Sequence, residues 1–404
     1  MQPLRDTQHD FSSKLCQPSI FPLLKEYVLW RRKLRKGIAS PPPTFSPVSV
    51  NLDLTTACNF ACPHCVDSGI INTGEQLDTE NIKSSIQTLS GRGLRSVILI
   101  GGGEPTLHRD ISEILLFVKS LGLQVGIVTN GTRLGPIREV AHCLEEKDWL
   151  RLSIDAARQE TFDASHRPRT ATRLADILRR ARDIKQANPD LSLGYSFVIV
   201  WDGVYLNGSR LQPNVTEMAE AAQLALEHEF DYISFKPCLV RLPHSQKETL
   251  LHETDSEAEE RIREAIRSNL EEARGVAGGS LHISESVNLK ALLHNEVVKL
   301  KSQPGTCHMQ YFRTVLAPSG IFHCPAFRGV GSALVGPSTG YAGEESFLAT
   351  VGSTAASIDS FDARVECSEV GCFYNHTNHW IEELIHSDDP LEDDHGGKDH
   401  NFFL

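Results

Sequence analysis

Six strand-like segments alternate with six helix-like segments between residues 48 and 274, and this alternation constrains the fold more than any other feature of the chain. Strict β-α alternation favours a parallel sheet covered by helices. The expected strands are 48–54, 96–100, 124–128, 150–154, 193–200 and 232–235. The expected helices are 79–90, 110–121, 135–146, 171–187, 214–228 and 254–274.

The chain divides into four regions by composition. Its 404 residues and apolar fraction of 40% suit one large domain with a smaller one. A proline-rich stretch, 40–47, ends an N-terminal helical segment. Beyond residue 280 the chain changes to short strand-like pieces with glycine, proline and four cysteines. We therefore expect an N-terminal segment at 1–47, a β/α domain at 48–280, a small α+β domain supported by metal at 281–386, and an acidic tail at 387–404. The tail is expected to be disordered, with docking over the barrel mouth as the alternative.

Charge and targeting signals restrict the compartment in which the protein is expected to act and the partners that it is expected to bind. No export signal or membrane-spanning apolar stretch is visible, so we expect a cytoplasmic protein without membrane contact. Ten cysteines then favour metal ligation and free thiols over disulfides. A net charge of −12 without a basic stripe argues against nucleic-acid binding, and the basic run at 25–36 is interpreted as a solvated helix face.

Three cysteines at C-x3-C-x2-C spacing follow the first expected strand. Cys58, Cys62 and Cys65 can hold three irons of a [4Fe-4S] cluster and leave the fourth iron open. A zinc site that adds His64 is the alternative, although structural zinc requires four ligands in closed tetrahedral geometry.

The other expected strands also end in polar residues, and in parallel β/α barrels the chemistry lies at these ends. Strand two ends in a glycine turn with a carboxylate, which can bind a cationic amine. A tight βα connection and ordinary turn chemistry are the alternatives for these residues. The candidates are Gly102, Gly103 and Glu104 after strand two, Thr129 and Asn130 after strand three, and Ser153 and Asp155 after strand four.

The cysteine loop and the strand ends together resemble the radical S-adenosylmethionine (radical SAM) superfamily. The resemblance implies a partial (β/α)6 TIM-like barrel, in which the open iron binds SAM and cleaves it to a 5'-deoxyadenosyl radical. It implies that the glycine-Glu104 turn binds the SAM amino group. It also implies an arginine near 166–169 for the SAM carboxylate, for which we take Arg167.

Strand six ends in Lys236 and Cys238, which should lie above the barrel near a bound substrate. A thiol there can donate a hydrogen atom to a substrate radical, which would give an epimerisation. A buried, inert cysteine is the alternative. Asn214 and Glu217 are interpreted as an N-terminal cap of the fifth helix.

A second cysteine set follows residue 300. Its members are Cys307, Cys324, Cys367 and Cys372, with a hairpin turning at Pro318-Ser319-Gly320 between the first two. The pattern resembles the SPASM and twitch domains, and four cysteines suffice for one auxiliary [4Fe-4S] cluster. The spacing from Cys367 to Cys372 is unusually wide, so His376 or Cys238 could replace Cys367, and a zinc ribbon is the alternative.

We expect, from this resemblance, a radical SAM oxidoreductase or epimerase that acts on a small polar metabolite such as a sugar or aminocyclitol. A reductant such as flavodoxin or ferredoxin is the expected partner. The alternatives are a maturase of ribosomal peptides, with a short peptide as substrate, and a metal-binding interaction protein without turnover.

Overall fold

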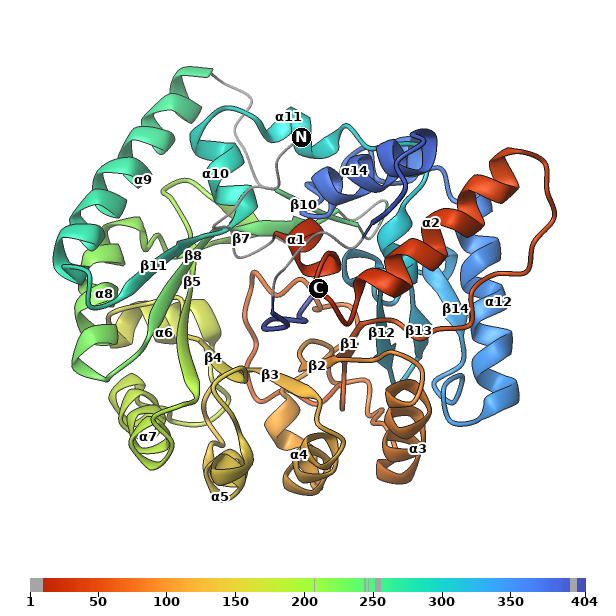
Figure 1. Ribbon diagram of the computed structural model, residues 1–404. Helices are drawn as coiled ribbons and strands as arrows, with labels where there is room; N and C mark the ends of the chain where they lie inside the picture. The colour runs from red at the N-terminus through yellow and green to blue at the C-terminus, as the bar shows by residue number, and fades with distance from the viewer. Residues whose placement is uncertain (1–9, 207, 243–244, 246, 251–255, 393–397) are drawn as a thin grey trace.

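The computed structural model describes residues 10–206, 208–242, 245, 247–250, 256–392 and 398–404, and its central feature is a large mixed sheet (Figure 1). The strand order is β11-β8-β5-β4-β3-β2-β1-β12-β13-β14, and every neighbouring pair from β11 to β12 is parallel. The strands are β1 (Ser49–Leu52), β2 (Ser96–Leu99), β3 (Gln124–Thr129), β4 (Trp149–Ser153), β5 (Ser192–Ile199), β8 (Tyr232–Pro237), β11 (His282–Glu285), β12 (Arg313–Ala317), β13 (Gly320–Phe322) and β14 (Leu334–Gly336).

The predicted six parallel strands are confirmed, and the sheet continues past both ends of the set. A seventh parallel strand, β11, pairs with β8, and β12 pairs with β1. The partial-barrel fold class is therefore correct, although the sheet joins residues on both sides of position 280. Two short antiparallel pairs lie outside it: β6 (Tyr205–Leu206) with β7 (Ser209–Arg210), and β9 (Leu239–Arg241) with β10 (Glu248–Leu250).

Helices cover the outside of the parallel strands (Figure 1). Their inner faces are apolar, as in α3, where Ile82, Ile86 and Leu89 are fully buried at helical spacing. The helices of this half are α3 (Thr79–Ser90), α4 (Ile111–Ser120), α5 (Gly135–Val140), α6 (Gln159–His166), α7 (Leu174–Ala187), α8 (Met218–Glu227), α9 (Ser256–Ala277), α10 (Val287–Leu293) and α11 (Val297–Lys301).

The region after residue 300 has a small core of its own. The predicted hairpin is present, because β12 and β13 pair with Ala317 opposite Gly320. Phe322, Phe327 and Phe361 pack together there with Cys367. Three helices complete this half: α12 (Glu344–Ser360), α13 (Ala363–Glu366) and α14 (Asn375–His386).

Both ends of the described chain lie at the N-terminal ends of the strands. Helix α1 (Phe11–Leu15) and helix α2 (Phe21–Arg35) lie there, and residues 398–404 join them. The Nε2 of Gln17 donates to the carbonyl of Asn401 (2.6 Å), and the backbone N–H of Phe402 donates to Gln124 Oε1 (2.9 Å). The prediction of a disordered tail is therefore wrong for 398–404, and the alternative of docking at the barrel mouth is wrong too, because these residues bind the opposite end. Residues 393–397 lie outside the described ranges.

The region between β4 and α8 differs from the sequence expectation at two points. The segment after β4 contains α6, which is not among the expected helices. Asn214 and Glu217 do not cap a helix: Asn214 donates to the carbonyl of Asp155 (2.7 Å), and Glu217 accepts from the N–H of Ala157 (2.8 Å). Both side chains are buried and hold the segment that leaves β4.

In the part of the chain that the structure describes, no helix is long and apolar enough to cross a membrane.

Candidate active site

The three cysteines of the first motif lie on the segment that leaves β1 at its C-terminal end, and all are half-buried. Burial raises the pKa of Cys62 well above its usual value, and the charges of Cys65, Asp155 and Cys58 raise it further. Burial likewise raises the pKa of Cys65 to about 12. Thiols that repel one another as thiolates suit a cationic ligand, and the irons of a cluster are cationic.

His166, the last residue of α6, holds one of these cysteines in place. Its Nε2–H donates to the carbonyl of Ile154 (2.7 Å), so Nδ1 is left to accept from the Cys62 thiol at 3.2 Å. The ring is fully enclosed, and burial lowers the pKa of His166. Sequence reasoning missed this contact, because it depends on a helix that the sequence pattern did not reveal.

The glycine turn after β2 touches the cysteine loop directly. The N–H of Glu104 donates to the carbonyl of Ala57 (2.8 Å), and a Cβ on Gly103 would lie 2.2 Å from that same oxygen. Gly102 has φ of +68°, in the left-handed region that favours glycine. Only glycine at position 103 therefore allows the two backbones to approach this closely.

Glu104 joins the ends of β2 and β3. Its Oε1 accepts from the hydroxyls of Thr106 and Thr129, each at 2.6 Å, and its Oε2 accepts from the N–H of Asn130 at 2.7 Å. Burial raises the pKa of Glu104, and these hydrogen bonds oppose the shift. Three of the predicted site residues thus form one cluster, and Oε2 retains room for a further donor.

Asp155 follows β4 and faces two histidines. Its Oδ2 lies 3.5 Å from His64 Nε2 and 3.7 Å from His166 Nε2, and its Oδ1 accepts from the N–H of Val198 (2.8 Å). Burial would raise the pKa of Asp155, but the histidines and the hydrogen bonds lower it. Ser153 lies two residues earlier on β4 and is half-buried.

The two candidate arginines lie differently. Arg167 directly follows α6 in a left-handed conformation with φ of +44°, and the side chains of both arginines are exposed. The N–H of Arg169 donates to the carbonyl of Asn59 (3.1 Å), and its charge lowers the pKa of Cys58, which burial raises. Arg169, rather than Arg167, is therefore tied to the cysteine loop.

Lys236 and Cys238 lie at the end of β8. Burial lowers the pKa of Lys236 well below its usual value, Arg151 lowers it further, and Asp155 opposes this. Cys238 is fully buried, its Sγ lies 3.5 Å from the carbonyl of Leu239, and burial raises its pKa to about 12. The sulfur therefore keeps its proton at neutral pH.

Arg328 links the two halves of the chain, and sequence reasoning missed it. Its Nε lies 2.6 Å from Asp53 Oδ2, and its Nη1 donates to both carboxylate oxygens of Asp67 at 3.0 and 3.1 Å. A Cβ on Gly101 would lie 2.5 Å from the guanidinium carbon. The guanidinium thus packs on the glycine turn and pairs with carboxylates at the end of β1 and after the cysteine loop. The sequence carries no signal for this, since the partners lie more than 250 residues apart.

The four later cysteines line one small cavity together. Burial raises the pKa of Cys324 to about 12, with the charge of Cys307 adding to the shift, and it also raises the pKa of Cys367. His323 lines the same cavity, and within the described residues neither of its ring nitrogens has a hydrogen-bond partner. Neither Cys238 nor His376 is part of this lining, so the structure places Cys367 with the other three.

The distances between the thiols decide whether each of the two cysteine sets can hold a single metal ion or a [4Fe-4S] cluster. Among the described residues, no three His, Cys, Asp or Glu side chains converge as around a single metal ion. Each cysteine of a [4Fe-4S] cluster binds its own iron, so a cluster does not require such convergence. Both cysteine sets fit a cluster on their donor chemistry.

Comparison with known proteins agrees with this geometry. Residues 52–204 match the model of the radical SAM superfamily. The chain is 36% identical to the mycofactocin maturase MftC of Mycolicibacterium smegmatis over 121 residues. This alignment covers 30% of each chain. Over 157 residues it is 29% identical to an S-adenosylmethionine-dependent nucleotide dehydratase of Selenomonas ruminantium, covering 37% of this chain and 56% of the relative. The alignments thus span only about a third to a half of these relatives.

Solved structures share the fold. A structure of anSMEcpe with bound AdoMet and the Cp18Cys peptide matches with a TM-score of 0.53 and 14% identity, covering 84% of this chain and 96% of that one. Streptococcus suis SuiB bound to the precursor peptide SuiA matches with a TM-score of 0.51 and 15% identity, covering 71% of this chain and 61% of that one. The cysteine loop, the glycine turn and the family match lead to one conclusion: residues 52–204 form a domain of the radical SAM superfamily, whose members use a [4Fe-4S] cluster and S-adenosylmethionine.

Proposed function

We propose that the chain is a radical SAM oxidoreductase that removes hydrogen from a carbon of a small polar substrate, with a second [4Fe-4S] cluster as the electron acceptor. The observation that carries this proposal is the shared cavity of Cys307, Cys324, Cys367 and Cys372. A second cluster allows an electron to leave the substrate radical, so that the net reaction is a dehydrogenation. A reductant such as flavodoxin or ferredoxin would supply the electron for the first step.

The residues around the cysteine loop have distinct roles in this proposal. Cys58, Cys62 and Cys65 hold the first cluster, which with bound SAM supplies the 5'-deoxyadenosyl radical. Gly102 and Gly103 allow close approach, and Oε2 of Glu104 accepts a hydrogen bond from the SAM amino group. Thr129, Asn130, Ser153 and Asp155 surround the ribose and carboxylate. For the SAM carboxylate itself we favour Arg169 over Arg167, because Arg169 is the one tied to the loop.

Lys236 and Cys238 decide the fate of the substrate radical. In this proposal Lys236, whose pKa burial lowers, accepts the hydroxyl proton that the substrate loses when its carbon radical gives up an electron. The Cys238 sulfur keeps its S–H, which is the form that donates a hydrogen atom. If Cys238 rather than the second cluster quenches the radical, the product is an epimer.

A peptide maturase is the second candidate function. It is favoured by the 36% identity to mycofactocin maturase, although that similarity covers only 30% of this chain. In the described part of residues 1–47, the helices α1 and α2 pack on the rest of the chain, and no separate peptide-binding unit is seen there.

An anaerobic assay in deuterium oxide tests these alternatives. The reconstituted enzyme is incubated with SAM, a reductant and either sugars and aminocyclitols or short peptides, and 5'-deoxyadenosine and products are measured. Dehydrogenation predicts an oxidised small product without solvent deuterium. Solvent deuterium that disappears in Cys238→Ala would instead establish epimerisation. Turnover of peptides alone would replace the first proposal with the second, and no 5'-deoxyadenosine with any substrate would contradict both.

A further inference from the structure

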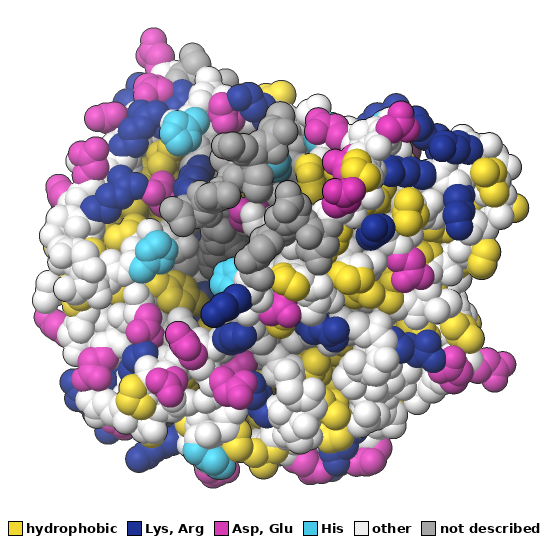
Figure 2. Space-filling view, viewed as in Figure 1, with side chains coloured by type: hydrophobic (Ala, Val, Ile, Leu, Met, Phe, Trp, Pro, Cys, Tyr) yellow, Lys and Arg dark blue, Asp and Glu magenta, His cyan; other side chains and the backbone are white. Residues whose placement is uncertain are grey.

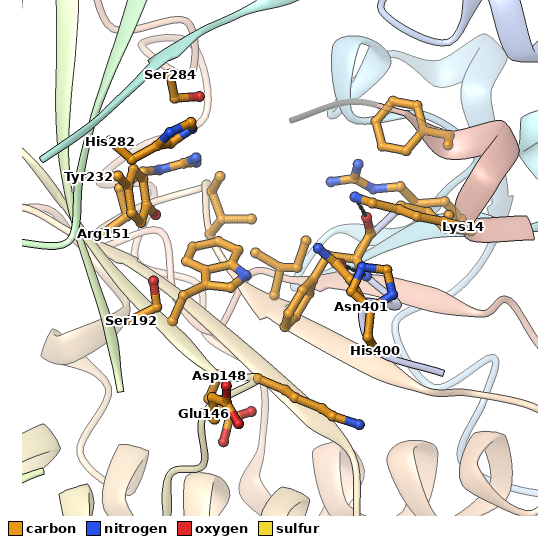
Figure 3. Close-up of a pocket in the computed structure, with 18 residues that line it drawn as sticks. Lys14, Glu146, Asp148, Arg151, Ser192, Tyr232, His282, Ser284, His400 and Asn401 are labelled. Atoms are coloured by element: carbon orange, nitrogen blue, oxygen red, sulfur yellow. Dashed lines mark hydrogen bonds between the residues drawn. The ribbon is translucent and has the colours of Figure 1, made fainter. Parts of the chain in front are cut away.

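A cavity of about 630 Å³ lies inside the barrel at the N-terminal ends of the strands (Figure 3). Ligand pockets in proteins commonly measure about 300–1,000 Å³. The first residues of five parallel strands line one side, and α1 with residues 400–404 lines the other. The five strand residues are Trp149, Ser192, Tyr232, His282 and Arg313. Figure 1 shows α1 across from β8 and β11, and Figure 2 shows Lys, Arg and His side chains near the centre of the same face.

Three cations enclose this cavity, and none of them forms an ion pair with a carboxylate of the described residues. Arg151 lies over the ring of Trp149, 5.1 Å from its centroid, and within the described residues its Nε has no hydrogen-bond partner. Arg313 donates to Asn51 Oδ1 (2.6 Å) and to the Tyr374 hydroxyl, and its Nε has no partner in the described ranges either. Lys14 donates to the carbonyl of Phe403 (2.5 Å). Figure 3 shows Arg151 and Lys14 on opposite sides of the space.

The cations repel one another. Burial lowers the pKa of Lys14 to about 7, and the charge of Arg313 contributes to this shift, against a smaller opposing effect of Asp10. Burial also lowers the pKa of Arg151; Tyr232 opposes the shift, Arg313 adds to it, and the carboxylate of Asp155 has a smaller opposing effect. A folded protein that keeps enclosed cations without a counter-ion loses stability, so such a cluster calls for a function.

The nearby acids are engaged elsewhere. Asp148 lines the cavity, but its Oδ2 lies 2.8 Å from Lys119 Nζ and its Oδ1 accepts from the N–H of Val125 (2.6 Å). Asp10 accepts hydrogen bonds from Ser12 and Ser13. Glu146, the remaining acidic side chain of the lining, is exposed at the rim. The other two acids, Asp148 and Asp10, thus have other hydrogen-bond or ion-pair partners.

We propose that this cavity, named here the lumen site, binds a small organic anion whose carboxylate or phosphate group lies between Arg151, Arg313 and Lys14. Guanidinium groups suit such groups, because their N–H donors match two oxygens at once. The rings of Trp149 and Phe403 contact the hydrocarbon part of the ligand. The site is separate from the cysteine loop, since it lies at the opposite ends of the strands, and it does not depend on the proposed function.

Calorimetric titration of the reconstituted protein tests the lumen site, with citrate and inorganic phosphate as probes at constant ionic strength. We expect saturable binding of at least one probe, which tells a carboxylate site from a phosphate site. Arg151→Gln is expected to weaken binding at least tenfold. The matched control is Arg138→Gln on the exposed surface of α5, which should bind as the wild type does.

The melting temperature without probe supplies a second readout. Since Arg151→Gln removes an uncompensated charge, the variant should melt at the wild-type temperature or above it, which shows that any loss of binding is not a loss of folding. Absence of saturable binding of both probes to the wild type would overturn the proposal. Equal affinity of the wild type and Arg151→Gln would also overturn it.

Discussion

The two ends of the barrel differ in the sign of their charged side chains and in whether those side chains have hydrogen-bond or ion-pair partners. At the C-terminal ends of the strands lie thiols and carboxylates, and Glu104 and Asp155 are held by several donors each. At the N-terminal ends lie Lys14, Arg151 and Arg313, which have no carboxylate partner among the described residues. The same parallel strands thus carry the candidate active site, with carboxylates already hydrogen-bonded, at one end and the proposed lumen site at the other.

The difference follows from how each end is built. Each strand of a parallel sheet ends at the same edge, so short motifs that follow successive strands meet there without long-range pairing. The opposite end is closed by segments far apart in the chain, as shown by Gln17 and Asn401, which are 384 residues apart. We expect cluster binding at the C-terminal ends of the strands to be sensitive to backbone geometry. We expect stability at the N-terminal ends to be sensitive to charge and packing.

Gly103→Ala should have the largest effect. The added Cβ would lie 2.2 Å from the carbonyl of Ala57, so the cysteine loop and the glycine turn must separate. We expect the variant to lose the first cluster and SAM cleavage, measured as iron content and 5'-deoxyadenosine. Gly135→Ala is the control, because nothing lies within 4 Å of its Cβ and wild-type behaviour is expected. Wild-type iron and cleavage in Gly103→Ala would show that the close approach is unimportant.

Arg328→Met should have the second-largest effect. It leaves Asp53 and Asp67 without their shared cation, and breaking a buried ion pair in this way costs about 4 kcal/mol. Denaturant unfolding under anaerobic conditions measures the loss. Arg158→Met, which breaks the exposed pair with Glu220, should unfold as the wild type does. If the two variants were equally stable, Arg328 would not link the halves of the chain.

Phe403→Ala tests the packing at the other end. The ring is 7% exposed and lies 5.3 Å from the ring of Trp149, so its loss should cost about 3 kcal/mol. Thermal unfolding measures this, with the exposed Tyr205→Ala as control. A melting temperature unchanged by Phe403→Ala would mean that residues 398–404 do not help to close the barrel.

Lys14→Met should have the smallest effect and one that depends on pH. The pKa of Lys14 is lowered from 10.5 to about 7 on folding, so the unfolded chain binds more protons between these values. Lys14 therefore destabilises the fold fully below pH 7, and this cost fades as the pH rises toward 10.5. Relief of this cost should raise the melting temperature of Lys14→Met at pH 6, with a smaller gain at pH 9. The same shift at both values would contradict this account of its charge.

The sequence predicted the catalytic end better than the closed end. The six strands, the Cys58 loop and the cluster of Glu104, Thr129 and Asn130 follow from local patterns, because parallel strands bring their ends together. Local patterns could not predict the partners of Arg328, since ion pairs across 261 residues depend on tertiary packing. The same reason explains why local patterns do not predict the contacts of Gln17 and Phe403 at the closed end, and why they predict a helix cap at Glu217 where the structure has a tertiary contact.

Iron counting with SAM cleavage tests the central claim most directly, namely that the Cys58 loop at one end of the barrel initiates the chemistry. We predict about eight irons per chain after anaerobic reconstitution, as two [4Fe-4S] clusters require. The triple variant Cys58→Ala, Cys62→Ala, Cys65→Ala should keep about four of them and form no 5'-deoxyadenosine. Wild-type iron content in that variant, or continued cleavage of SAM, would contradict the claim.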